Sequence, residues 1–126
     1  MSDLIERARV AVKDARILLE AGSPQGAISR AYYSMFHAAR AALRAIDPEL
    51  NRAKTHATVL RRFSRHVIVE QRQAAELGRQ LRTAFELRQF ADYDGPDVSM
   101  AQARIAVENA ETFLDELIVF IGTRSE

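Results

Sequence analysis

The sequence predicts an all-α fold: an antiparallel up-and-down bundle of four long helices plus one short helix, in a single domain over residues 1–126. Two observations predict it. Apolar residues recur every three or four positions along most of the chain, which is the spacing of one face of an α-helix. Glycine (5 residues) and proline (3 residues) are scarce and fall between these periodic segments. With 48% hydrophobic and 28% charged residues, a chain of 126 residues can bury a core without disulfides or metals.

The first helix is expected from about Asp3 to Ala21, with a stop at Gly22. Ser23 and Pro24 are typical of an N-cap and of the first helical position, so a second helix begins after a very short turn. The first two helices are therefore predicted to be antiparallel neighbours. The apolar stripe of the first helix consists of Leu4, Ala8, Ala11, Ala15, Leu18 and Leu19.

The second helix, from about Pro24 to Ile46, organises the chain because it has three different faces. Its core stripe consists of Ile28, Tyr32, Met35, Phe36, Ala39, Leu43 and Ile46. A face that would let another helix backbone approach closely consists of the small residues Ala31, Ser34, Ala38, Ala41 and Ala45. A basic, hydrogen-bonding face consists of Arg30, Tyr33, His37, Arg40 and Arg44. A surface helix needs only one apolar face, so we expect a central helix with a site or an interface along its polar side.

The third helix is predicted to be short. Asp47-Pro48 ends the second helix, because the residue before a proline is disfavoured in the α region. A loop is expected from Glu49 to Lys54. Thr55 can then cap a third helix that extends to about His66.

A fourth helix is expected from about Glu70 to Asp92, and a break at Asp94-Gly95-Pro96 separates it from a fifth. Ser99 and Gln102 form a capping box, in which each side chain accepts a hydrogen bond from the other residue's backbone N–H. The fifth helix extends to about Ile121. Its apolar stripe consists of Ala106, Val107, Ala110, Phe113, Leu114, Leu117, Ile118 and Ile121.

The fourth helix breaks its own apolar pattern. Its inward stripe of Leu77, Leu81, Ala84 and Phe85 continues directly onto Arg88 and Asp92. A charged side chain rarely occupies a buried stripe unless it is paired, because its desolvation costs roughly several kcal/mol. Arg88 and Asp92 are one helical turn apart and can pair with each other, and Tyr93 follows before the break. Two interpretations stay open: a structural ion pair at the end of the bundle, or an arginine held at a cleft to bind phosphate.

The charge distribution points to a possible anionic partner. Net charge is only +1, but residues 40–66 contain seven Lys and Arg against two acids, whereas residues 97–126 contain two against six. Arginine outnumbers lysine sixteen to two, and its planar fork suits phosphate and carboxylate. These charges are either solvated helix faces or a basic patch for RNA or a nucleotide.

The composition also excludes several classes of protein. The absence of cysteine excludes disulfides and thiolate catalysis. No segment has the length of a membrane span, and the first residues lack a signal-peptide pattern, so a cytoplasmic location is expected.

Three segments together resemble the signature of HEPN-domain proteins. They are Arg30-Ala-Tyr-Tyr-Ser-Met-Phe-His37, Lys54-Thr55-His56 and Arg88-Gln-Phe-Ala-Asp92-Tyr93, in the same order and with similar spacing. The closest branch is the small stand-alone one that is often encoded beside a minimal nucleotidyltransferase. The resemblance implies an antiparallel helical bundle that usually dimerises. It also implies a role in nucleotide or RNA biology, often inside toxin–antitoxin or defence systems.

The resemblance implies an alternative function as well, because many HEPN proteins are metal-independent ribonucleases with an Arg-x(4–6)-His motif. In those proteins the histidine and arginine act at the scissile phosphate. Here Arg88 is followed five residues later by Tyr93, and tyrosine, with a reference pKa near 10, is a poor base at neutral pH. Arg30-x6-His37 fits the loosest spacing of the motif. Arg61-x4-His66 also fits, but it lies outside the family position and is interpreted as a chance match.

Two of the signature segments have a structural as well as a functional interpretation. His37 is either a hydrogen-bonding group that faces a ligand or a structural histidine between helices. Lys54 and His56 flank a predicted helix N-terminus, where free N–H groups and the helix dipole favour an anion. The alternative for this segment is helix capping with solvent-exposed side chains.

The leading hypothesis is a dimeric nucleotide- or RNA-binding module that works with a minimal nucleotidyltransferase in a toxin–antitoxin or defence-type system. Its expected ligand-binding residues are Arg30, Tyr33, His37, Lys54, His56, Arg88, Asp92 and Tyr93. The first alternative is a metal-independent endoribonuclease toxin that uses Arg88 with His37 or Tyr93. The second is a non-catalytic helical scaffold. No cofactor is expected, and no metal site, because His37, His56 and His66 include no i, i+4 pair and there is no cysteine.

Overall fold

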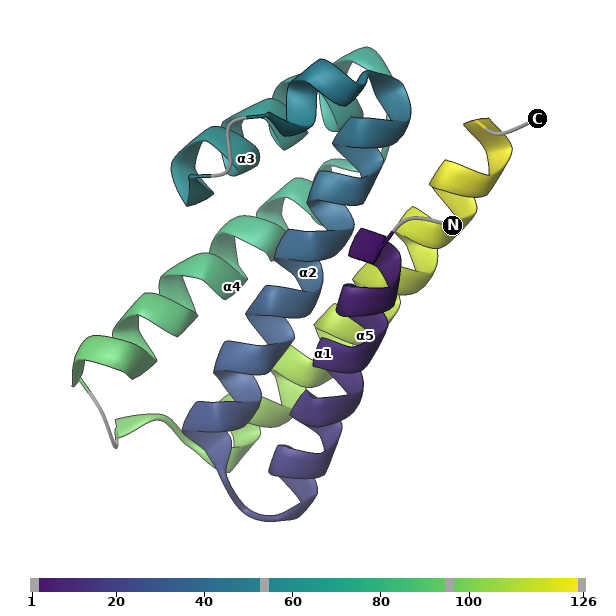
Figure 1. Ribbon diagram of the computed structural model, residues 1–126. Helices are drawn as coiled ribbons and strands as arrows, with labels where there is room; N and C mark the ends of the chain where they lie inside the picture. Colours follow the sequence, from purple (N-terminus) through teal and green to yellow (C-terminus); the bar gives the residue numbers. More distant parts are fainter. Residues whose placement is uncertain (1–2, 53–54, 95–96, 125–126) are drawn as a thin grey trace.

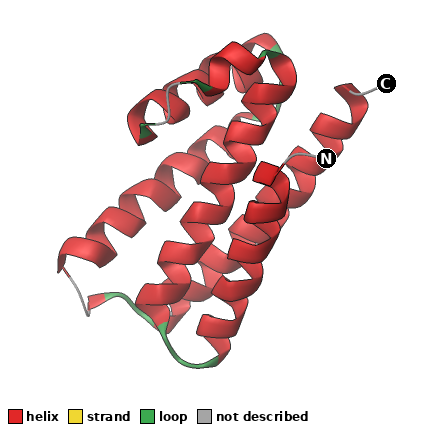
Figure 2. Cartoon of the chain, viewed as in Figure 1, coloured by secondary structure: helices red, strands yellow, loops and turns green. Residues whose placement is uncertain are grey.

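The computed structural model describes residues 3–52, 55–94 and 97–124, and every regular element within these ranges is a helix. The elements are α1 (Asp3–Glu20), α2 (Pro24–Ile46), the 3₁₀-helix η1 (Pro48–Asn51), α3 (His56–Arg62), the π-helix η2 (Phe63–Glu70), α4 (Ala75–Asp94) and α5 (Met100–Arg124). Figure 2 shows these helices joined by short loops. The all-α bundle of four long helices and one short one is therefore confirmed.

The second helix is central, as its three faces predict. Successive long helices run in opposite directions, and α2 lies between α1 and α4 while α5 passes behind (Figure 1). Each of the other three long helices contacts α2, whereas α4 and α5 contact each other much less. The α3–η2 segment lies across one end of the bundle (Figure 1). The side of α2 between α1 and α4 is therefore the one that no long helix covers.

The small residues of α2 do allow a close approach by α1. Ala31, Ser34 and Ala38 are buried, and Ser34 Oγ donates a hydrogen bond of 2.8 Å to the Ala8 carbonyl of α1. A bulky side chain at these positions would separate the two backbones. Ala45, at the end of the same face, is exposed and takes no part in this packing.

The turn between α1 and α2 follows from Gly22. Its φ of +80° is in the left-handed region that favours glycine. Gly22 N donates to Leu19 O at 3.1 Å and Ser23 N donates to Leu18 O at 2.9 Å, which is the Schellman arrangement. The expected boundary at Pro24 is confirmed, but Ser23 makes no side-chain capping bond.

The two caps predicted further along the chain are present. Thr58 N donates to Thr55 Oγ1 at 3.3 Å at the start of α3. At the start of α5, Gln102 N donates to Ser99 Oγ at 3.0 Å and Ser99 N donates to Gln102 Oε1 at 2.8 Å. The second pair is a complete capping box.

The expected boundaries around the short helix were wrong. The α-helical part ends at Arg62 and continues as the π-helix η2 to Glu70, and α4 begins at Ala75 rather than near Glu70. Periodicity gave no sign of the π-helix, because it reports only that Phe63 and Val67 share a buried face. The turn before α4 contains Arg72 at φ 57°, and no glycine or proline marks it.

Two further boundaries differ by about one turn. The expected loop after the second helix contains η1, which begins at Pro48, and the Asp47 carboxylate accepts a hydrogen bond of 3.0 Å from Glu49 N. The last helix continues to Arg124, past the expected end at Ile121.

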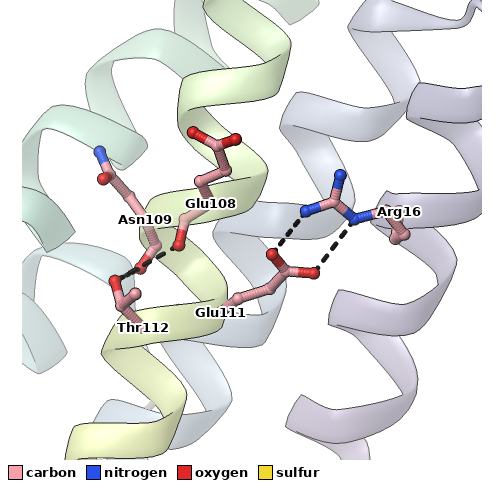
Figure 3. A network of polar contacts seen from close by, with 5 residues as sticks. All are labelled: Arg16, Glu108, Asn109, Glu111 and Thr112. Carbon is pink, nitrogen blue, oxygen red and sulfur yellow. Dashed lines mark hydrogen bonds and ion pairs between the residues drawn. The ribbon is translucent and has the colours of Figure 1, made fainter.

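An ion pair joins the first and last long helices (Figure 3). Arg16 Nη2 donates to Glu111 Oε1 at 2.6 Å, and Arg16 Nε donates to Glu111 Oε2 at 3.2 Å. In the same turn of α5, the Thr112 hydroxyl donates to the carbonyls of Glu108 and Asn109 at 3.3 and 3.1 Å. Of the described helices, none is long and apolar enough to cross a membrane.

Candidate nucleic-acid interface

Arg88 of α4 lies against α2 with its guanidinium held in three ways. Its Nη2 donates a hydrogen bond of 3.0 Å to Tyr33 Oη. Its Nε lies 3.0 Å from Asp92 Oδ2, so the ion pair expected one helical turn away is present. The guanidinium carbon is 5.0 Å from the centre of the Tyr33 ring and 5.8 Å from that of Tyr32. With 20% of its side chain exposed, Arg88 is fixed at the surface edge between the two helices.

The contact between Arg88 and Asp92 is a charge interaction and not a full hydrogen bond. Arg88 Nε is buried, yet no acceptor meets it with hydrogen-bond geometry in the described part of the chain. The short distance to Asp92 therefore balances the charge without satisfying this donor. Within the described ranges, the guanidinium makes one hydrogen bond, to Tyr33.

Tyr33 connects the groups on this face. Its ring stacks on that of His37 with centres 6.2 Å apart and planes 30° apart. The Arg30 guanidinium carbon lies 5.6 Å from the Tyr33 ring centre, and that of Arg88 lies on the ring as well. Five of the expected site residues thus form one group, which we name the Tyr33 cluster. It consists of Arg30, Tyr33, His37, Arg88 and Asp92.

His37 is held in the neutral form. Burial lowers its pKa to about 4, and the neighbouring Arg40, Arg7 and Arg30 add to this effect. Its Nδ1 is buried and has no hydrogen-bond partner among the described residues. The imidazole therefore carries no charge near pH 7. Stacking on Tyr33 and a tilted contact with Phe36 hold it in place.

His56 faces inward and not toward solvent. Its ring centre is 4.6 Å from that of Phe36 and 5.7 Å from that of Phe85, and its Nδ1 is 2.6 Å from Tyr32 Oη. Burial lowers the pKa of His56, with a smaller effect from Arg88, and burial also raises the pKa of Tyr32. These contacts make His56 part of an aromatic group beneath the Tyr33 cluster.

The Tyr33 cluster does not include the remaining expected residues, Lys54 and Tyr93, nor His66, whose match to the motif we interpret as chance. Lys54 is outside the described residues. Tyr93 is 85% exposed and forms no hydrogen bond with the described part of the chain. Five residues of an α-helix turn through about 140° net, so Tyr93 leaves α4 in a different direction from Arg88. His66 lies on η2, with Nδ1 2.7 Å from Glu70 Oε1, and takes no part in the Tyr33 cluster.

Two further arginines, outside the expected site residues, lie close enough to His37 to affect its protonation. Arg40 is only 7% exposed; its Nε donates to Asn51 Oδ1 at 3.0 Å, and its guanidinium carbon lies 5.8 Å from the Phe36 ring centre. Burial lowers the pKa of Arg40, as do Arg7 and Arg44. Neither Arg40 nor Arg7 forms an ion pair with a described residue. The sequence placed Arg40 on the basic face of its helix, but nothing in it brought Arg7 of α1 to this side.

A pocket of about 430 Å³ opens between α1 and α2, next to the Tyr33 cluster. We name it the α1–α2 pocket. Its lining consists of Asp3, Glu6, Arg7, Val10, Arg30 and His37. Within the described ranges, no group of three or more His, Asp or Glu side chains could hold a metal ion. The arrangement therefore offers cations, an aromatic ring and a neutral imidazole, which are groups that bind phosphates and bases.

Known proteins resemble this chain over nearly its whole length. The sequence model of the HEPN domain matches residues 1–119. A "UPF0332 protein" of Gloeobacter violaceus is 31% identical over 122 residues, which cover 95% of this chain and 94% of that protein. A protein of Methanocaldococcus jannaschii named "Putative toxin" is 33% identical over 114 residues, covering 90% of this chain and 83% of that protein. Another from the same organism with that name is 32% identical over 122 residues, covering 97% and 77%.

These matches agree with the resemblance carried by the three signature segments and with the all-helical fold around them. The chain belongs to the HEPN domain family.

Proposed function

We propose that this protein is a toxin-like module that binds RNA or nucleotides through the Tyr33 cluster. In this proposal it acts as a homodimer and works with a minimal nucleotidyltransferase. The observation that carries the proposal is the Arg88 guanidinium, which Tyr33 and Asp92 hold at the edge between α2 and α4. The names of two relatives support a toxin-like role.

The geometry of Arg88 suits a phosphate. A guanidinium binds phosphate oxygens through two parallel N–H groups, and the resulting hydrogen bonds are stronger than those between neutral groups. Because Arg88 is already held by Tyr33, little side-chain entropy is lost when a ligand binds. The half-buried ring of Tyr33 beside it offers a surface on which an unpaired base can stack.

Stability alone does not explain why an arginine occupies this position. An i, i+4 ion pair at a partly exposed site contributes only about 0.3–0.5 kcal/mol. An aliphatic side chain that continues the stripe of Leu77 and Leu81 would bury apolar surface and avoid desolvating a charge. The contacts of Arg88 therefore support binding over a purely structural scaffold.

Homodimerisation and the partner protein belong to the same proposal. Phe90 is 41% exposed and Tyr93 85% exposed, and their spacing of three residues places them close together on the last turns of α4. Aromatic residues of this kind are enriched at protein interfaces. Both side chains leave α4 in directions different from that of Arg88, so a partner that covers them would leave the Arg88 site open to a ligand. The minimal nucleotidyltransferase comes from the branch of the family that the chain resembles.

A second candidate function, metal-independent RNA cleavage, is favoured by His37. Its neutral imidazole can accept a proton, and it lies one stacked ring away from Arg88. A pKa of about 4 makes it a weak base, however, and Tyr93 leaves α4 away from Arg88. Binding without cleavage is therefore the function that we propose.

The test compares two arginines of α4. Arg82 is exposed and forms no ion pair with a described residue, so Arg82→Gln is a control with the same change in charge as Arg88→Gln. Binding of a fluorescent single-stranded RNA is measured by anisotropy. Loss of one charged hydrogen-bond donor predicts that Arg88→Gln weakens binding about tenfold or more, while Arg82→Gln weakens it less than threefold.

Equal losses in the two variants would contradict the proposal, provided that both have the wild-type circular dichroism spectrum. The same RNA, incubated with wild-type protein in a metal chelator, is expected to stay intact. If wild type cleaves the RNA and neither Arg88→Gln nor His37→Gln does, the ribonuclease alternative would replace the proposed binding function.

A further inference from the structure

The α1–α2 pocket contains two arginines that form no ion pair within the described part of the chain. Arg7 enters it from α1 and Arg30 from α2. Neither forms an ion pair with a described residue, although both lie close enough to His37 to affect its protonation. Arg40 is buried on the same side, where Asn51, a neutral residue, is its hydrogen-bond partner. Among the described residues, none of these three guanidinium groups pairs with a carboxylate, although Asp3 and Glu6 line the same pocket.

His37 adds a hydrogen-bond donor to the same pocket. Because Nδ1 is buried and no described residue bonds to it, the tautomer that leaves Nδ1 unprotonated avoids burying an unsatisfied N–H group. We therefore assign the proton to Nε2. Since His37 lines the pocket and no described residue accepts from this ring, the Nε2–H is available to a ligand. A donor between two guanidinium groups suits an anion.

Other residues of α1, on the same wall as Arg7, select among anions. Asp3 and Glu6, in the first turns of α1, line the pocket together with Val10. Carboxylates repel a bare phosphate, but they accept hydrogen bonds from ribose hydroxyls and from the amino groups of bases. The side chain of Val10, which is 49% exposed, offers an apolar surface. A volume of about 430 Å³ is within the range of pockets that bind small molecules.

The geometry points to a second phosphate site, in which Arg7, Arg30 and the ring of His37 bind the terminal phosphate of a nucleotide or of an RNA strand. The carboxylates of Asp3 and Glu6 then contact the sugar or base of the same nucleotide. Arg30 lies on the Tyr33 ring, so this site adjoins the one that contains Arg88. The inference deepens the proposed function, because it names the chemical group at one end of the bound RNA.

The variants for the test are two arginines of α1. Arg7 and Arg9 are both exposed and unpaired within the described chain, but only Arg7 lines the pocket. Arg7→Gln and Arg9→Gln therefore make the same change in charge inside and outside the site. Substitutions of such surface residues rarely disturb folding. Arg88→Gln serves as the third variant, because it removes the neighbouring site and leaves the pocket unchanged.

Two pairs of ligands isolate the contribution of the phosphate. AMP is compared with adenosine by titration calorimetry, and an RNA decamer with a 5′- or 3′-phosphate is compared with its hydroxyl form. We expect the phosphorylated member to bind about tenfold more tightly in at least one pair. Arg7→Gln reduces this preference to less than threefold, and Arg9→Gln retains it. Inorganic phosphate is expected to bind more weakly than AMP, because it has no sugar or base to contact Asp3 and Glu6.

The pattern of results identifies the ligand. A preference for AMP alone assigns the pocket to a free nucleotide, and a preference for phosphorylated RNA alone assigns it to a strand end. No preference in either pair, or a preference that Arg7→Gln leaves intact, would overturn the inference. If RNA does not bind at all, the proposed function is contradicted. The comparison of AMP with adenosine still tests whether the pocket binds a phosphate. Arg88→Gln is expected to weaken both RNA forms and to leave AMP binding unchanged.

Discussion

Arg16 and Arg7 lie on the same helix but have opposite surroundings. On the side of α1 that faces α5, two hydrogen bonds join Arg16 to the carboxylate of Glu111 (Figure 3), and they raise the pKa of Arg16. On the side that faces α2, Arg7 lines an open pocket beside Arg30 and His37 and forms no ion pair with a described residue. The charge of Arg16 is therefore paired within the fold, whereas that of Arg7 has no paired carboxylate among the described residues.

This contrast distinguishes two kinds of arginine. One kind pairs with a carboxylate of another helix, and the other kind has no such pair and is a candidate to bind a ligand. A paired guanidinium such as that of Arg16 needs no further partner. Unpaired positive charges close together repel one another, and a bound anion would reduce this repulsion. Arg88 is intermediate, because Asp92 balances its charge while its Nε donor stays unsatisfied. The unpaired side of the molecule is therefore where we expect its ligands.

The largest expected effect is on the aromatic centre of the unpaired side. Tyr33→Ala removes the ring that contacts Arg30, His37 and Arg88. Loss of a stacking surface costs about 1–3 kcal/mol per base, so RNA affinity is expected to fall roughly fivefold to 150-fold. Tyr33→Phe, which keeps the ring and loses the hydrogen bond to Arg88, serves as the intermediate control. Anisotropy titration measures both, and unchanged affinity in Tyr33→Ala would mean that the RNA binds elsewhere.

A smaller effect is expected on the paired side, and on stability instead of binding. Glu111→Gln breaks the charge pair with Arg16, both of whose side chains are partly exposed, so it is expected to cost about 0.5–1 kcal/mol. The melting temperature falls by roughly 2–4 °C. Arg7→Gln is expected to leave the melting temperature unchanged or slightly raised. Thermal melts of both variants test the comparison between the two sides. Equal falls in melting temperature, or weaker RNA binding by Glu111→Gln, would contradict it.

The last effect is seen only at low pH and concerns the protonation of His37. Because the pKa of His37 is lowered to about 4, below its ordinary value of 6.5, the folded protein binds this proton less readily than the unfolded chain. The contribution to stability is fully present above pH 6.5 and is lost as the pH falls toward 4. His56, whose pKa is also lowered, acts in the same direction. Urea titrations should therefore show a flatter pH dependence in His37→Gln than in wild type, and identical slopes would contradict the burial of this ring.

Much of the fold could be predicted from the sequence, because local signals determine most of it. The ends of α2 follow from Pro24 and from Asp47-Pro48, and the capping box of Ser99 starts α5. The π-helix and the late start of α4 could not be predicted. The turn at Arg72 contains no glycine or proline, and a four-residue spacing does not distinguish a π-helix from an α-helix.

The grouping of the candidate site residues could be predicted where they lie on one helix. It could not be predicted where they come from different helices. The family signature and the interrupted apolar stripe together indicated Arg88 with Asp92, and the faces of one helix grouped Tyr33 with His37. The inward position of His56 depends on how α3 crosses the end of the bundle, which no local pattern specifies. Arg7 was missed for the same reason, since only the packing of α1 on α2 brings it beside His37.

The central claim is that Arg88 and Tyr33 act together as one preformed binding unit. A double-mutant cycle on RNA affinity, with Arg88→Gln, Tyr33→Phe and the double variant, tests it most directly. Residues in contact that share a ligand show interaction energies of about 0.5–3 kcal/mol. We therefore predict that the loss of binding free energy in the double variant is smaller than the sum of the losses in the two single variants. Additive losses, or none in either single variant, would contradict the claim.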